Sequence, residues 1–151
     1  MPQSLARLYV HIVYSTKHRC RFLADKDIRE EMHAYLGWVC RNQECPALIV
    51  GGIADHVHIL IRLSRLISIA DFLKELKIQS SKWVKTRGGI LTKFQWQSGY
   101  GAFSVGQDEL DRVVSYIRDQ EEHHRKKTFQ EEYRRFLREY RIEYDERYVW
   151  D

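Results

Sequence analysis

Two histidines separated by one residue are the first candidates for chemistry in this sequence. His56 and His58 flank Val57 in the run from His56 to Arg62, which is rich in β-branched and apolar residues and predicts a strand. Alternate residues of a strand point to the same face, so the two imidazoles would lie close enough to share one metal ion. The pair alone also fits two half-buried histidines without a ligand role.

A tyrosine and a glutamine four residues apart are the second pair of candidates. Apolar spacing predicts a helix from about Gln107 to His124 that contains Tyr116 and Gln120. On a wheel of about 100° per residue, these two side chains share a face with His123 at the edge of the apolar stripe, where a side chain can line a cleft. The same spacing also fits a tyrosine at a helix edge beside a solvated glutamine.

Short-range patterns place both pairs among further strands and helices. Strands are predicted at Leu8–Tyr14, Leu48–Val50, His56–Arg62 and near Lys93–Gln97, with a loop or short strand at Tyr100–Val105. Helix starts are predicted from one N-cap residue and two capping boxes, at Asp25, at Ser68 with Asp71, and at Thr128 with Glu131. The order β-α-β-β-α-β, followed by extra helices, predicts an α+β fold. It would be a ferredoxin-like (RRM-like) antiparallel sheet with helices on one face and additional C-terminal helices.

Length and composition limit the class of protein. The chain has 151 residues, 44% of them hydrophobic and 30% charged, which excludes collagen, low-complexity disorder and small disulfide scaffolds. A domain of this size can bury about 69% of its surface and needs no disulfide or structural metal. Cys20, Cys40 and Cys45 are odd in number and form no C-x-x-C motif, so unpaired thiols are expected. Because no apolar run suits a transmembrane helix or a signal peptide, we expect a soluble cytoplasmic protein.

Basic charge is concentrated in the middle of the chain. The net charge is +4, and residues 62–93 alone carry eight basic and two acidic side chains. Lys74, Lys77 and Lys85 would form one stripe on the second helix, and Trp96 could stack on unpaired bases. This distribution suggests binding to a polyanion such as nucleic acid, and it equally fits an ordinary solvated helix face.

Five segments resemble, in the same order, the small single-tyrosine HUH transposases of bacterial and archaeal insertion sequences, which are related to REP-associated tyrosine transposases. In chain order they are HIVYSTKHRCRFL, IADHVHILI, FQWQSGYGAFSV, YIRDQEEHH and YDERYVW. HUH denotes two histidines around a hydrophobic residue, here His56, Val57 and His58. Because the resemblance covers nearly the whole chain, it implies a single HUH transposase domain over residues 1–151.

The resemblance implies a metal-dependent transposase that cleaves and rejoins single-stranded DNA at transposon ends. It implies that Tyr116 attacks a DNA phosphodiester to form a 5'-phosphotyrosine intermediate. His56, His58 and Gln120 would hold a divalent metal, Mg²⁺ or Mn²⁺, and these neutral ligands leave the charge of the cation for the phosphate. The implied partners are single-stranded DNA with hairpin-containing ends and a second copy of the chain, with Tyr116 completing the other subunit's site in trans.

Other functions are compatible with parts of this pattern. A domesticated relative that processes REP palindromes would share the same residues. A non-catalytic RRM-like nucleic-acid-binding module is weakly suggested by Tyr100–Val105, but it leaves the histidine pair and the Tyr–Gln spacing unexplained. A two-histidine phosphoesterase is excluded because no histidine begins an H-x-S/T element. His123 and His124 could contact DNA, assist a proton transfer or simply end the helix, and His11 could approach the site.

Overall fold

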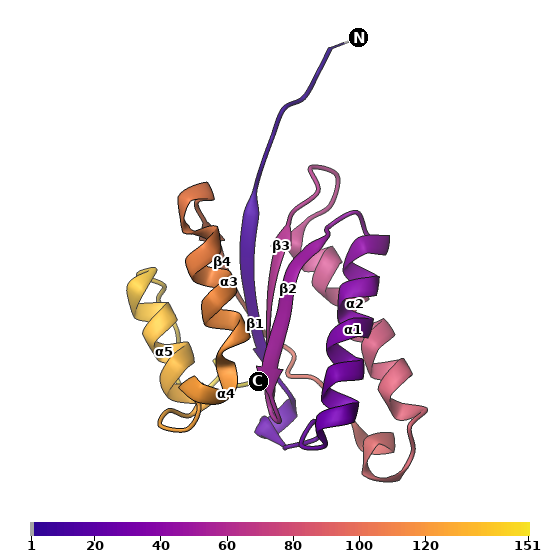
Figure 1. Ribbon diagram of the computed structural model, residues 1–151. Coiled ribbons are helices and arrows are strands. Elements are labelled where there is room, and N and C mark those ends of the chain that lie inside the picture. The colour runs from indigo at the N-terminus through magenta and orange to yellow at the C-terminus, as the bar shows by residue number, and fades with distance from the viewer. Residues whose placement is uncertain (1) are drawn as a thin grey trace.

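A four-stranded antiparallel sheet in the order β2-β3-β1-β4 is the centre of the fold in the computed structural model, which describes residues 2–151 (Figure 1). The strands are β1 (Tyr9–Ser15), β2 (Ala47–Ile53), β3 (His56–Arg62) and β4 (Gly101–Val105). Alternation along β3 sends Val57 and Ile59 into the main core on one face and leaves His56 and His58 on the other, as the sequence predicted. Both histidines are buried, because Gln120, Phe129 and Glu132 pack against them on this face.

Two long helices cover the first face and enclose the main core. α1 (Lys26–Asn42) and α2 (Ile69–Lys85) begin at the predicted caps. The Asp25 side chain accepts two backbone hydrogen bonds in the first turn of α1, and Ser68 accepts one from Asp71 at the start of α2. Apolar side chains of both helices pack against the buried side of β1 and β3.

Three helices from the last part of the chain cover the other face (Figure 1). They are α3 (Leu110–Arg118), α4 (Gln120–His123) and α5 (Phe129–Glu139). α5 begins at the predicted cap, because the Thr128 hydroxyl accepts a hydrogen bond from the backbone of Glu131. The α+β, ferredoxin-like class with additional C-terminal helices is confirmed. Among residues 2–151, no helix has the length and apolar character needed to cross a membrane.

The fourth strand lies later in the chain than the Lys93–Gln97 position that the sequence predicted. Gly89–Lys93 forms a 3-10 helix, η2, and β4 lies within the segment predicted as a loop or short strand. Phe94 and Trp96 are buried in the main core, and Trp96 makes only an isolated bridge to Thr16. Because core packing takes up these two aromatic side chains, a regular ladder with β1 forms only after the loop that follows them.

The helix predicted over Gln107–His124 is interrupted. It consists of a 3-10 turn, η3 (Gln107–Glu109), followed by α3 and α4. Elsewhere in the chain, another 3-10 turn, η1 (Lys17–Arg19), follows β1. The break falls at Asp119, whose backbone (φ −94°, ψ 26°) departs from helical geometry. After this break Gln120 is only 1% exposed and faces the side of the sheet that carries the histidines.

Candidate active site

β3 carries two histidine side chains to the centre of the face that α4 and α5 cover. His56 and His58 are fully buried, and their ring centroids lie 5.2 Å apart. Nδ1 of His56 donates to the Asp55 carboxylate at 2.7 Å, so Nε2 presents a lone pair when the ring is neutral. That lone pair faces Oε1 of Gln120 at 3.1 Å. A cation shared between these two facing acceptors would stabilise both.

α3 and α4 bring the other two predicted residues to the histidines. The amide nitrogen of Gln120 donates to the backbone carbonyl of Tyr116 at 3.3 Å, across the break between the helices. The half-buried ring of Tyr116 lies 5.8 Å from the His58 ring and stacks on His123 at 4.5 Å, both measured between centroids. One chain therefore brings together in cis the residues that the resemblance implied would meet in trans.

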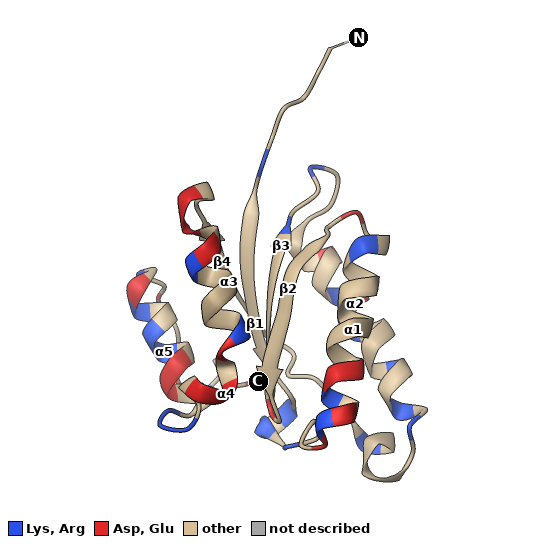
Figure 2. Ribbon diagram, viewed as in Figure 1, with Lys and Arg blue, Asp and Glu red and all other residues tan. Residues whose placement is uncertain are grey.

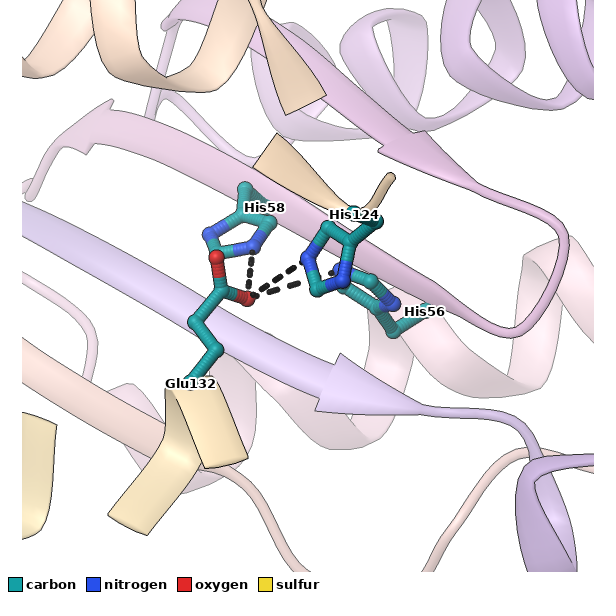
Figure 3. Close-up of side chains that lie close together, drawn as sticks. All are labelled: His56, His58, His124 and Glu132. Atoms are coloured by element: carbon teal, nitrogen blue, oxygen red, sulfur yellow. Dashed lines mark hydrogen bonds and ion pairs between the residues drawn. The ribbon is translucent and has the colours of Figure 1, made fainter. Parts of the chain in front are cut away.

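A buried carboxylate that sequence reasoning missed lies beside His56, His58 and His124 (Figure 3). Glu132 on α5 accepts a hydrogen bond from Nε2 of His58 at 2.9 Å and another from the Tyr116 hydroxyl. Its Oε1 also lies 3.5 Å from Nε2 of His56 and 3.2 Å from Nε2 of His124. Glu132 thus contacts both the candidate nucleophile and three histidines.

The sequence carries one signal for Glu132. It lies three residues after Phe129 and four before Phe136, which places it on the buried face of α5. Because acidic side chains are almost never fully buried unless they are paired, an acid at such a position indicates a polar partner in the interior. His124 carries no comparable signal, since it lies in a turn whose position depends on where α5 docks.

Burial and charge set the protonation of this cluster. Burial lowers the pKa of His58 by more than the charge of Glu132 raises it. Burial alone would raise the pKa of Glu132, but the imidazoles of His58, His124 and His56 close to its carboxylate hold that pKa far below its usual range. Burial and the Glu132 charge raise the pKa of Tyr116, so its hydroxyl is neutral near pH 7. The lowered pKa values of His58 and Glu132 both favour the deprotonated forms in which these side chains bind metal ions.

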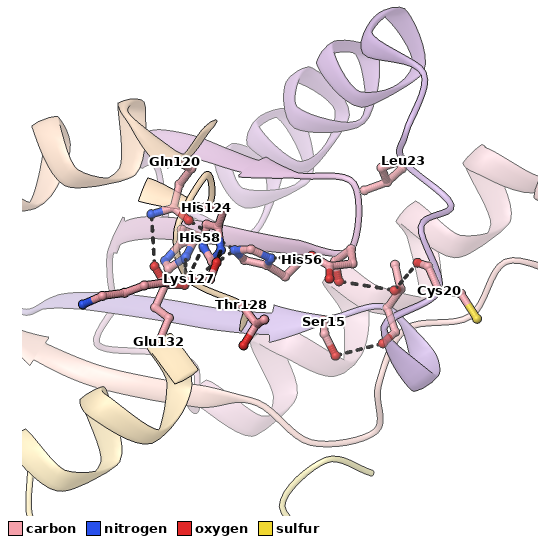
Figure 4. A network of polar contacts seen from close by, with 12 residues as sticks. Ser15, Cys20, Leu23, His56, His58, Gln120, His124, Lys127, Thr128 and Glu132 are labelled. Carbon is pink, nitrogen blue, oxygen red and sulfur yellow. Dashed lines mark hydrogen bonds and ion pairs between the residues drawn. The ribbon is translucent and has the colours of Figure 1, made fainter. Parts of the chain in front are cut away.

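These residues fit a divalent metal ion. One ligand atom from each of His56, His58, His124 and Glu132 lies within 4.8 Å of the others. Nε2 of His124 is buried and, within residues 2–151, has no aligned hydrogen-bond partner, although it lies 3.2 Å from Glu132. Gln120 adds an amide oxygen to the same network (Figure 4). Imidazole nitrogens combined with carboxylate and amide oxygens suit first-row divalent metals.

A cavity of about 290 Å³ lies beside the Tyr116 hydroxyl. Its lining includes Lys126, Lys127 and Arg135, and the guanidinium of Arg135 donates to the Tyr116 hydroxyl at 3.0 Å. Lysine and arginine side chains bind phosphate through charge-assisted hydrogen bonds. The cavity therefore brings three cationic side chains close to Tyr116, together with the carboxylates of Glu122 and Glu132.

Trp96 and the lysines predicted to contact DNA belong to the layer on the other side of the sheet. Trp96 is 8% exposed, its ring packs edge to face on Tyr14 at 4.9 Å between centroids, and its Nε1 donates to Ser80 at 2.9 Å. This ring is therefore not exposed for stacking on bases. Lys74 and Lys85 are exposed side chains of α2. Helix α2 lies on the opposite side of the sheet from α5 (Figure 2).

Lys77 differs from the other two lysines of the stripe because it is tied to the backbone. Its Nζ donates to the carbonyl oxygens of Gln97, Ser98 and Gly99 at 2.8, 3.2 and 2.7 Å. Burial lowers the pKa of Lys77 to about 8. The ammonium group thus stabilises the loop that leads into β4.

Comparison with known proteins identifies relatives of this chain. The model of the family described as "Transposase IS200 like" matches residues 4–120, which include His56, His58, Tyr116 and Gln120. The transposases for insertion sequence element IS200 of Salmonella typhimurium and Salmonella typhi are each 29% identical over 117 residues. Those alignments cover 73% of this chain and 74% of each relative. α5 and its Glu132 lie beyond the residues that the family model matches.

Two solved structures share the fold. A protein of Deinococcus radiodurans, described as a transposase, superposes with a TM-score of 0.62 at 20% identity, covering 80% of this chain and 95% of that chain. The REP-associated tyrosine transposase bound to a REP hairpin superposes with a TM-score of 0.60 at 14% identity, covering 82% of this chain and 73% of that chain. Since the family match spans most of its length, this chain belongs to the IS200-like transposase family and is a DNA transposase.

Proposed function

We propose that this transposase acts on single-stranded DNA, cleaving and rejoining it at transposon ends through a 5'-phosphotyrosine intermediate, with the aid of a divalent metal. The observation that carries the proposal is the convergence of Tyr116 with His56, His58 and Gln120 around one buried polar cluster. A site with a phenol, two imidazoles and an amide oxygen can both attack a phosphodiester and hold a cation beside it.

Tyr116 is the nucleophile of the proposed reaction. Its hydroxyl oxygen forms a bond to phosphorus, the bond from phosphorus to the 3' oxygen breaks, and the released strand ends in a 3' hydroxyl. The phosphotyrosine bond retains the energy of the phosphodiester, so a 3' hydroxyl can reverse the step without ATP. In the structure the phenol donates a hydrogen bond to the Glu132 carboxylate.

His56, His58 and Gln120 are the proposed metal ligands, with Mg²⁺ or Mn²⁺ as the ion. A bound divalent ion would polarise a phosphate oxygen and offset the charge that develops as the tyrosine attacks. Asp55 holds the His56 ring with Nε2 directed at Gln120, so this half of the ligand set is oriented before any ion arrives. His124 and Glu132 offer two further ligand atoms in the same cluster.

Arg135, Lys126 and Lys127 are the residues proposed to guide the DNA backbone to Tyr116. They line the cavity beside the hydroxyl, and Arg135 already donates to it at 3.0 Å. A guanidinium in this position can hydrogen-bond a phosphate oxygen and stabilise the charge that grows on it during attack.

Hairpin-containing single-stranded ends are the proposed substrate, because the REP-associated transposase of the same fold is bound to a REP hairpin. The same likeness supports a second candidate, a domesticated enzyme that processes REP palindromes. We further propose that the chain forms a homodimer in which each site is assembled in cis, since Tyr116 reaches the histidines within one chain.

A covalent-adduct assay tests the proposal. The protein is incubated with Mn²⁺ and single-stranded oligonucleotides from both flanks of its own coding sequence, and denaturing gels detect DNA bound to protein. Tyr116→Phe should abolish the adduct and leave DNA binding nearly unchanged, because only the hydroxyl oxygen is removed. Tyr148→Phe, at a tyrosine that is 63% exposed, is the matched control and should react normally. An adduct at normal yield with Tyr116→Phe would contradict the assignment, and binding without any adduct would favour the non-catalytic RRM-like module.

A further inference from the structure

His11 on β1 is a buried histidine that the proposed chemistry leaves without a role. It is only 3% exposed, and its Nε2 lies 2.8 Å from Nδ1 of His58 on the neighbouring strand. The contact joins two inner strands of the sheet, whose register places Val13 opposite His58 and His11 opposite Leu60. His11 is thus the diagonal neighbour of a proposed metal ligand.

Aromatic side chains hold the His11 ring in place. Phe136 lies edge to face at 5.2 Å between ring centroids, and Phe103 and Tyr116 make similar contacts at 6.4 Å each. A ring packed on several sides has little freedom to turn, so the position of its Nε2 relative to His58 is well defined.

The chemistry of imidazole gives this contact a direction when His58 binds a metal. A neutral ring has one N–H and one lone pair, so a ring that coordinates through Nε2 must carry its proton on Nδ1. The Nδ1–H then needs an acceptor, and within residues 2–151 the only partner of Nδ1 of His58 is Nε2 of His11. Metal-bound histidines generally donate their second N–H to such an outer partner, which fixes both the tautomer and the ring orientation.

We propose that His11 is a positioning residue: when a metal ion takes the place of the Glu132 contact at Nε2 of His58, His11 accepts the Nδ1–H of His58 and holds this ligand in its metal-binding tautomer. The inference rests on the proposed metal-dependent function. The hydrogen bond from Nδ1 of His58 to His11 would match the hydrogen bond of 2.7 Å that Nδ1 of His56 donates to Asp55. The two ligands therefore have different outer partners, a carboxylate for His56 and an imidazole for His58.

The second nitrogen of His11 is also accommodated. When Nε2 accepts from His58, the proton of His11 resides on Nδ1. His11 lines a cavity of about 340 Å³ beside Tyr116, with Arg112, Glu109 and Glu139 also in the lining. A polar cavity of this size admits water, which can accept the hydrogen bond from Nδ1.

Mn²⁺ titration by calorimetry on the full chain tests the proposal with three substitutions. His11→Leu keeps an apolar side chain among the aromatic rings but removes the acceptor, so the Mn²⁺ affinity should fall by about 10- to 100-fold. His11→Gln places an amide oxygen near the former Nε2 position and should restore affinity close to that of the unaltered protein. His33→Leu, at a histidine on α1 without a hydrogen bond to His56 or His58, is the control and should bind Mn²⁺ normally.

The outcomes separate this inference from the proposed function. The positioning role is overturned if His11→Leu binds Mn²⁺ with unaltered affinity. It is also overturned if His11→Gln and His11→Leu lose the same affinity while thermal melting in EDTA shows that both variants are folded. Absence of Mn²⁺ binding by the unaltered protein overturns the metal-dependent function itself. If His11→Leu does not fold, nitrogen-15 NMR of the unaltered protein saturated with Mg²⁺ decides: His58 protonated on Nδ1 supports the proposal, and His58 protonated on Nε2 refutes it.

Discussion

Replacing Gly51 with alanine should disturb the site through the backbone alone. Gly51 lies on β2 directly opposite His58 on β3, and α3 packs over it. A Cβ at this position would lie 2.5 Å from the carbonyl oxygen of Ile117 and 2.9 Å from its Cγ2. Ile117 follows Tyr116 in α3, so any displacement of this turn moves the candidate nucleophile.

The geometry sets the size of the expected effect. Ordinary van der Waals contact begins near 3.4 Å, so the helix and the strand must separate by about 0.9 Å to admit the methyl group. Overpacking of this kind typically costs about 1–3 kcal/mol of the free energy of unfolding. A catalytic group misplaced by about 1 Å can lower the reaction rate roughly 10²-fold. We expect both effects in Gly51→Ala, with DNA binding retained.

Urea denaturation and the rate of covalent-adduct formation measure the two effects separately. Gly37→Ala is the matched control, because a Cβ at Gly37 in α1 meets no atom within 4 Å. Alanine in a helix interior should raise the free energy of unfolding by about 0.5–1 kcal/mol and leave the adduct rate unchanged. Unaltered stability and rate in Gly51→Ala would refute the close packing of α3 on β2 as the device that positions Tyr116.

Three further outcomes follow from the site and the charge distribution. His58→Ala should weaken Mn²⁺-dependent adduct formation more than Gln120→Ala, because water can replace an amide oxygen more readily than an imidazole; equal losses would argue against His58 as a ligand. Neutralising the exposed Lys74 and Lys85 should reduce the slope of log affinity against log salt for single-stranded DNA by up to about 0.7 per lysine. Fluorescence anisotropy measures this slope, and an unaltered slope would show that the two lysines are solvated surface residues that do not contact DNA. Mixed dimers of His58→Ala and Tyr116→Phe chains should stay inactive in the adduct assay if sites form in cis, whereas recovered cleavage would demonstrate sites shared in trans.

The sequence alone determined the features that depend on neighbours a few residues away. The caps at Asp25, Ser68 and Thr128 form where predicted, because each cap hydrogen bond spans only two or three residues. The common face of His56 and His58 was equally predictable, since the side-chain period of a strand is two. The helical spacing also placed Tyr116 and Gln120 on one side of their segment, where they indeed lie close together.

Only the tertiary structure decided the features that depend on competition between distant segments. The fourth strand lies at Gly101–Val105 and not near the predicted Lys93–Gln97, because Phe94 and Trp96 pack in the core. Such core packing cannot be predicted from a local sequence pattern. The sequence pattern did not distinguish Lys77 from Lys74 and Lys85 on the same helix. Only the fold shows that its ammonium group donates to three backbone carbonyl groups. Glu132 meets His58 across 74 positions in the sequence, and that contact exists only because α5 docks on the face of the sheet that β3 supplies with histidines. A hydrogen bond of a few ångströms between such distant residues requires every intervening turn to be placed, and no short-range rule specifies that.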